Sequence, residues 1–98
     1  MTFKKATPEE RKAYLKDYHA LIRKIRTYTN ADTELLGKAW RLAEKRHDGQ
    51  RRKNNVPYIT HPLAVAHFLA DLRLENEIIA AALLHDVLED TPTSLAEL

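Results

Sequence analysis

The feature that most constrains the fold is a run of seven apolar residues at positions 78–84, followed at once by polar groups. His85, Asp86, Glu89 and Asp90 lie within six positions, so four groups able to bind metal or carry protons end an apolar helix. Burial of charge without a partner is costly. A bound cation would compensate for it, and imidazole beside carboxylate suits a divalent transition metal. We therefore expect the rest of the chain to support this turn.

Size and composition allow one small domain. The chain has 98 residues, no cysteine, and apolar runs far too short to cross a membrane. The absence of cysteine excludes a disulfide, a thiolate metal site and a cysteine nucleophile. The polar N-terminus carries no signal-peptide core, so we expect a cytoplasmic protein.

Charge is divided along the chain, although the net charge is only +2. Residues 38–53 contain seven basic and two acidic side chains, whereas residues 71–98 contain seven acidic side chains and one basic one, Arg73. A phosphate ester bound beside a metal ion needs such a division. Charge alone favours the simpler interpretation, in which the two regions are oppositely charged, solvated helix faces.

Apolar residues recur at helical spacing in four segments, and we find no strand pattern. We expect helices from Pro8 to about residue 28, from 32 or 33 to about 47, from about 60 to 72, and from 75 or 76 to about 90. Thr60 or His61 is expected to cap the third helix, and a capping box near Ser94 opens a fifth. The pattern predicts an all-α bundle of about four to five helices.

The loop after the second helix carries three consecutive cations, Arg51, Arg52 and Lys53. Such cations can converge on a phosphate, and a planar guanidinium can also stack on a base. An equally simple interpretation is a solvated turn. Trp40 and His47, which lie on one face of the second helix, are expected to pack in the core, although His47 could also support the metal-binding turn.

His61 stands at the expected start of the third helix, where its ring can turn away from the helix to bind a metal ion. His85 and Asp86 diverge by about 100° around a helix, so they can hold one ion from two directions. Glu89 and Asp90 follow one helical turn later. A His-Asp dipeptide alone is common, but this combination with an upstream histidine is far more specific.

Three segments in this order, residues 47–53, 57–62 and 82–91, carry a resemblance to a known family. From about residue 36 to residue 98, the chain resembles the N-terminal hydrolase domain of the RelA/SpoT family, which makes and degrades the stringent-response alarmone (p)ppGpp. The resemblance implies the helical HD fold of metal phosphohydrolases. By the same resemblance, His61, His85 and Asp86 match three ligands of the family's Mn²⁺ ion, and Glu89 and Asp90 match the acidic pair that activates or positions the attacking water.

Arg52 and Lys53 match the pair that lines the family's guanosine nucleotide site. The implied reaction is hydrolysis of the 3′-pyrophosphate of ppGpp or pppGpp, which yields GDP or GTP and pyrophosphate. The implied partner is therefore a guanine nucleotide, and we expect neither a membrane nor a nucleic acid as partner.

Two departures from the family pattern stand out. Asn55 occupies a position where the family usually has glycine, and asparagine tolerates the left-handed backbone at small cost. The family's fourth metal ligand is an aspartate on a later helix, beyond Leu98. We therefore expect residues 1–98 to be one N-terminal portion of an HD domain, with a leading helix at 1–30 and the metal-site helices at 31–98. Faces exposed by such truncation could pair two chains as a homodimer.

Two other functions stay open. The chain could be another HD-type phosphohydrolase that acts on a different nucleotide, or a non-catalytic module that binds a nucleotide, RNA or a protein partner through the basic loop. RNA is least favoured because the basic segment is short and lacks interleaved aromatic residues. The ion is also open, because nitrogen and oxygen ligands suit Fe, Co, Ni and Zn as well as Mn²⁺.

Overall fold

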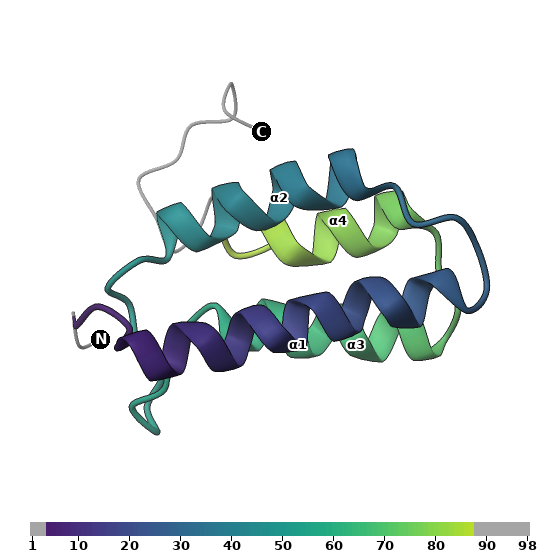
Figure 1. Cartoon of the computed structure of the whole chain (residues 1–98). Helices are drawn as coiled ribbons and strands as arrows, with labels where there is room; N and C mark the ends of the chain where they lie inside the picture. Colours follow the sequence, from purple (N-terminus) through teal and green to yellow (C-terminus); the bar gives the residue numbers. More distant parts are fainter. Residues whose placement is uncertain (1–3, 88–98) are drawn as a thin grey trace.

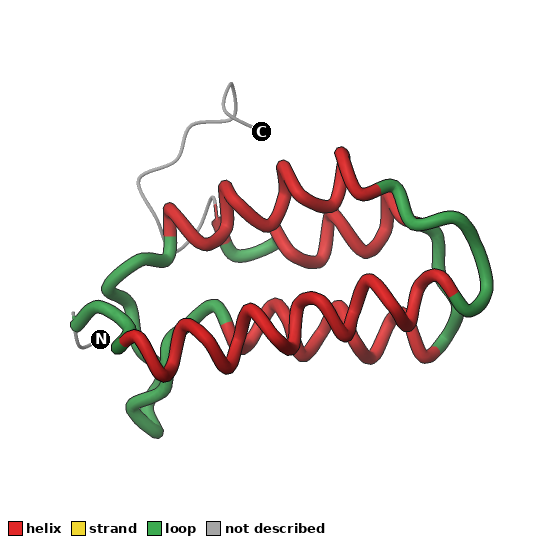
Figure 2. The backbone as a smooth tube through the Cα atoms, in the orientation of Figure 1, coloured by secondary structure: helices red, strands yellow, loops and turns green. Residues whose placement is uncertain are grey.

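The computed structural model of the protein describes residues 4–87, and these residues fold into four helices in two layers (Figures 1 and 2). The helices are α1 (Pro8–Arg26), α2 (Thr33–Arg46), α3 (Thr60–Asp71) and α4 (Asn76–Leu84). α1 packs against α3, α2 against α4, and α3 against α4. The described part contains no strand, so the predicted all-α fold is confirmed. Within residues 4–87, no helix combines the length and apolar character needed to cross a bilayer.

The start of α1 shows how local chemistry sets a helix boundary. The Thr7 hydroxyl accepts from the Glu10 N–H at 3.1 Å, and the Glu10 carboxylate accepts from the Thr7 N–H at 2.8 Å. This capping box satisfies two backbone donors, and Pro8 at the first helical position has no N–H to satisfy. The predicted start is confirmed.

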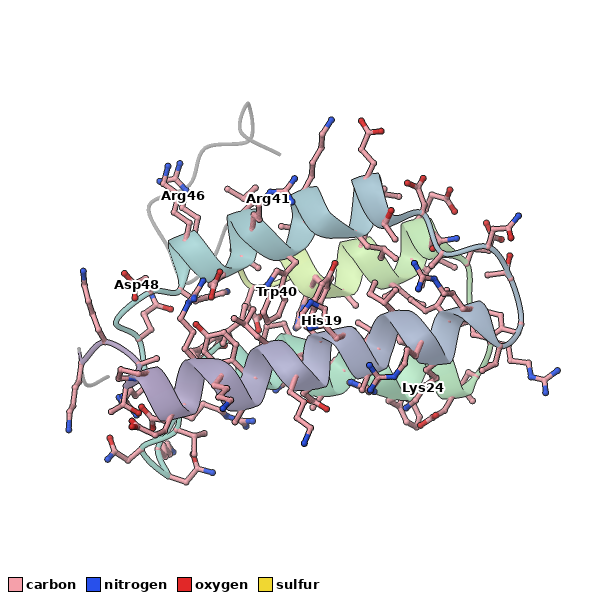
Figure 3. The ribbon with its side chains drawn as sticks, viewed as in Figure 1. His19, Lys24, Trp40, Arg41, Arg46 and Asp48 are labelled. Atoms are coloured by element: carbon pink, nitrogen blue, oxygen red, sulfur yellow. The ribbon has the colours of Figure 1, made fainter. Side chains whose placement is uncertain are left out.

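Trp40 is the centre of the aromatic part of the core. It is buried between α1 and α2 (Figure 3), as predicted. Its ring stacks on Tyr18 with centroids 4.6 Å apart and meets Tyr14 edge-on at 5.8 Å. Each such aromatic pair contributes about 0.5–1.5 kcal/mol beyond the burial of its area. These contacts join the two layers of the molecule.

The third helix starts where predicted, but neither Thr60 nor His61 caps it. The N-cap residue is Ile59, which has no side-chain acceptor. The Thr60 hydroxyl instead donates to the Pro57 carbonyl at 2.7 Å, because the tight turn before α3 brings that carbonyl within reach. The fourth helix also starts as predicted, but the predicted end near residue 90 is wrong: α4 ends at Leu84, and His85 and Asp86 follow it in a turn. The expected start of a fifth helix near residue 94 lies outside the described residues.

Two residues with positive φ shape the loop between α2 and α3. Gly49 (φ 87°) follows the last turn of α2, and Asn55 (φ 66°) closes a turn in which its N–H donates to the Arg52 carbonyl at 2.8 Å. Arg51 and Pro57 form an isolated bridge across the loop. Asn55 thus has the left-handed backbone that glycine or asparagine adopts most readily, and the loop folds back toward the start of α3.

Candidate metal centre

Three potential ligands meet where α3 begins and α4 ends, at the same end of the bundle (Figure 1). One donor atom each of His61, His85 and Asp86 lies within 4.8 Å of the others. Asp86 Oδ2 is 3.6 Å from Nε2 of His61 and 3.2 Å from Nε2 of His85. Two donors on opposite sides of an ion lie about 4.4 Å apart when each bond is about 2.2 Å. The observed separations of up to 4.8 Å are close to that distance. Small side-chain rotations therefore suffice for all three donor atoms to reach one ion.

Core packing holds this arrangement in place. Leu83 and Val87, on either side of the His85–Asp86 pair, are both fully buried. His61 lies in the first turn of α3, and its N–H donates to the Tyr58 carbonyl at 2.9 Å. Because α3 packs against α4, the relative position of the two helix ends is fixed by the same contacts that stabilise the fold.

The ring of His85 is held in one tautomer by its own helix. Its Nδ1 lies 2.7 Å from the Ala82 carbonyl oxygen, one of the last carbonyls of α4. A carbonyl can only accept a hydrogen bond, so Nδ1 carries the proton and Nε2 presents a lone pair when the ring is neutral. That lone pair faces the Asp86 carboxylate at 3.2 Å, and two electron-rich atoms at this distance need a proton or a cation between them. Metal-binding histidines are commonly oriented by such a backbone contact, so the donor set fits a divalent ion.

Tyr58 makes a further contact with this cluster. Its hydroxyl donates to Asp86 Oδ2 at 3.1 Å, and its ring lies against His47 and edge-on to His61, with centroid distances of 4.7 and 5.9 Å. His47 is buried, which confirms the core prediction, and its Nδ1 is 2.8 Å from the side-chain oxygen of Gln50. No role was predicted for Tyr58. Its place within the 57–62 segment that resembles the family, three residues before a candidate ligand, is the signal that could have indicated one.

The three loop cations differ in their surroundings. Arg51 is only 4% exposed, and its guanidinium donates to both carboxylate oxygens of Glu10 at 2.7 and 2.8 Å and to three backbone carbonyls. All five of its N–H groups are thus used. The hydrogen bonds from Arg51 and from the Thr7 backbone lower the pKa of Glu10 to about 2. The interpretation in which all three cations converge on a phosphate is therefore wrong for Arg51, whereas Arg52 and Lys53 are exposed.

The predicted acid–base pair, Glu89 and Asp90, lies outside the described residues, and its role stays a prediction. Glu10, the partly exposed partner of Arg51, was not predicted to contact the basic loop. In the sequence, the capping box of α1 already explains why a glutamate stands at position 10. No further feature of the sequence indicated that Glu10 also binds Arg51.

Comparison with known proteins agrees with this geometry. The HD domain family model matches residues 39–98, which include every residue of the cluster. The bifunctional (p)ppGpp synthase/hydrolase SpoT of Escherichia coli K12 is 44% identical to this chain over 82 residues. The chain is an HD domain of the RelA/SpoT family.

This HD domain is also similar to two other members of the family. It is 50% identical over 64 residues to the bifunctional (p)ppGpp synthase/hydrolase RelA of Mycobacterium tuberculosis. It is 57% identical over 51 residues to the guanosine-3′,5′-bis(diphosphate) 3′-pyrophosphohydrolase of Haemophilus influenzae. The three matches cover 83%, 65% and 52% of this chain, but only 12%, 9% and 8% of the relatives. The chain thus spans a small part of their length. An HD hydrolase domain implies a divalent metal cofactor, and the nitrogen and oxygen donors of the cluster suit one.

Proposed function

We propose that this HD domain holds one divalent ion, Mn²⁺ by the family resemblance, and hydrolyses the 3′-pyrophosphate of (p)ppGpp. The observation that carries the proposal is the convergence of two imidazole nitrogens and a carboxylate oxygen, from His61, His85 and Asp86, with the His85 tautomer suited to metal binding. The names of the relatives, among them a guanosine-3′,5′-bis(diphosphate) 3′-pyrophosphohydrolase, support the choice of substrate.

In the proposed reaction, water adds across the bond between the ribose 3′ oxygen and the pyrophosphate group. The phosphorus gains the hydroxyl, the 3′ oxygen gains a proton, and GDP or GTP and pyrophosphate separate. When bound, a divalent ion supplies Lewis-acid chemistry for this step. Glu89 or Asp90 accepts the proton of the attacking water and positions that water.

Arg52 and Lys53 neutralise the phosphates of the substrate as they approach the carboxylates of the site. Both are exposed on the loop whose backbone is tied to α1 through Arg51 and Glu10. A loop already ordered in the free protein loses less conformational freedom when it binds a ligand. The ion pair between Arg51 and Glu10 therefore supports substrate binding by ordering the loop, although the Arg51 guanidinium is itself fully occupied and does not reach the phosphates.

The test is incubation of the 98-residue chain with ppGpp and Mn²⁺, with the products separated by ion-exchange chromatography. We expect Mn²⁺-dependent release of pyrophosphate that EDTA, His61→Ala or His85→Ala abolishes. His19→Ala is the matched control, because His19 is an exposed histidine on α1 outside the cluster. Preferred hydrolysis of GTP or a dNTP would favour another HD-type phosphohydrolase. Nucleotide binding without hydrolysis of any substrate would favour the non-catalytic module.

We also propose that the protein is cytoplasmic and forms a homodimer. Phe68 of α3, Leu72 just after α3 and Ile78 of α4 are large apolar side chains that stay 61%, 56% and 43% exposed. Packing them against a second chain removes that surface from water. Light scattering should report a dimer that Phe68→Ser with Leu72→Ser dissociates. A monomer at every concentration would refute the dimer.

A further inference from the structure

We propose that Tyr58 is a positioning residue for Asp86, and that its hydroxyl directs one lone pair of the carboxylate toward the bound ion. The inference rests on the metal site of the proposed function, but it does not depend on which substrate is hydrolysed.

The backbone of Tyr58 is held on both sides. Its N–H donates to the Gln50 carbonyl, and its carbonyl accepts from the His61 N–H, each at 2.9 Å. The second bond joins Tyr58 to the first turn of α3, which carries His61. The phenol and one candidate ligand are therefore mounted on the same rigid segment.

The ring of Tyr58 is confined by two imidazoles. It is tilted by 32° to the His47 ring, with centroids 4.7 Å apart, and lies edge-on to His61 at 69° and 5.9 Å. His47 is itself buried, and Gln50 orients its ring through Nδ1 at 2.8 Å. A side chain held from two directions has few rotamers available, so its hydroxyl is presented at a defined point.

That point is Asp86 Oδ2, the same oxygen that faces both histidines. The hydroxyl lies 3.1 Å from it, and Nε2 of His61 and of His85 lie 3.6 and 3.2 Å from it. A carboxylate oxygen accepts at two lone pairs, and Tyr58 must be the donor. The hydroxyl therefore occupies one lone pair and leaves the other for an ion between the histidines. At 3.1 Å this bond is longer than the usual 2.7–2.8 Å or so for a hydroxyl donor.

Loss of a hydrogen bond that orients a metal ligand typically weakens metal binding by about 10–100-fold. Tyr58→Phe removes the hydroxyl and keeps the ring against His47, so we expect Mn²⁺ affinity to fall by about tenfold or more with an unchanged far-UV circular dichroism spectrum. Tyr28→Phe is the matched control, because the Tyr28 hydroxyl donates to the Leu74 carbonyl at 2.7 Å, beyond the opposite end of α4. It should leave Mn²⁺ affinity unchanged.

The affinity is measured by isothermal titration calorimetry with Mn²⁺ alone, and the visible absorption of the Co²⁺-loaded protein reports the arrangement of the ligands separately. In an Asp86→Ala background, titrated at higher Mn²⁺ concentration, Tyr58→Phe should change the affinity by less than about twofold, because Tyr58 acts through the carboxylate.

Equal affinity and equal Co²⁺ spectra for Tyr58→Phe and the unaltered chain would overturn the inference. So would a tenfold loss that persists in the Asp86→Ala background, or an equal loss in Tyr28→Phe. Failure of the unaltered chain to bind any ion would overturn this inference together with the metal site. Failure to hydrolyse ppGpp while the Tyr58-dependent affinity is retained would remove only the proposed reaction.

Discussion

A divalent ion should stabilise the fold only when both histidines of the cluster are present. The perturbations are His61→Ala and His85→Ala. The two side chains are 32% and 43% exposed, and substitutions at partly exposed positions away from the core usually change the free energy of unfolding by about 0.5 kcal/mol or less. Without metal, each variant should therefore unfold close to the unaltered chain.

The effect of the ion is much larger. A ligand that binds only the folded state stabilises it by about 2.7 kcal/mol at a free concentration of about 100 times its Kd. For a chain of this size, 1 kcal/mol shifts Tm by about 4–8 °C, so Mn²⁺ should raise the Tm of the unaltered protein by about 10–20 °C. The same Mn²⁺ concentration should shift each variant far less. The double variant should lose no more than either single one, because both act on one ion.

Thermal unfolding followed by circular dichroism, with Mn²⁺ and again after EDTA, measures these shifts. His19→Ala should keep the full shift, because it removes an exposed imidazole of α1 that lies outside the cluster. If His61→Ala and His85→Ala also keep the full shift, or if their losses add in the double variant, the two imidazoles do not share an ion.

Other contacts make separate predictions. Because hydrogen bonds lower the pKa of Glu10 from 4.5 to about 2, Glu10→Gln should be less stable than the unaltered protein above pH 4.5, and urea unfolding should show the gap closing as the pH falls toward 2. Leu83 is fully buried, so Leu83→Ala should lower the free energy of urea unfolding by about 3–5 kcal/mol. Asn55 has φ 66°, so Asn55→Gly should be nearly neutral, whereas Asn55→Val should cost about 1–2 kcal/mol in the same assay. The Glu10 assignment would be contradicted if the stability difference between Glu10→Gln and the unaltered protein did not change with pH. The other two would be contradicted if Leu83→Ala lowered the free energy of unfolding by less than about 1 kcal/mol, or if the two Asn55 variants were equally stable.

Features that depend on neighbours in the chain could be predicted from the sequence. Thr7 followed three residues later by Glu10 is a capping signal, and the structure places both hydrogen bonds of the box there. The apolar periodicity around Trp40 likewise predicted its burial. The resemblance to a family predicted that His61, His85 and Asp86 act together, and the fold brings these three side chains to one place.

Features that depend on distant partners could not be predicted. In sequence, Arg51 and Arg52 are adjacent and chemically identical, and the burial of the first depends on Glu10, 41 positions away. The contact of Tyr58 with Asp86 spans 28 positions and arises only when α3 and α4 pack. Thr60 is a favourable cap residue by type, but the Pro57 carbonyl takes its hydroxyl. The first two cases are decided by tertiary packing, and the third by the conformation of a local turn three residues long, and residue type encodes neither.

The most direct test of a shared ion is a crystal structure grown with Mn²⁺, with anomalous scattering recorded at the manganese edge. We expect one anomalous peak per chain within about 2.3 Å of Nε2 of His61, Nε2 of His85 and a carboxylate oxygen of Asp86. A peak elsewhere, or no peak with the two imidazoles turned apart, would contradict the metal centre.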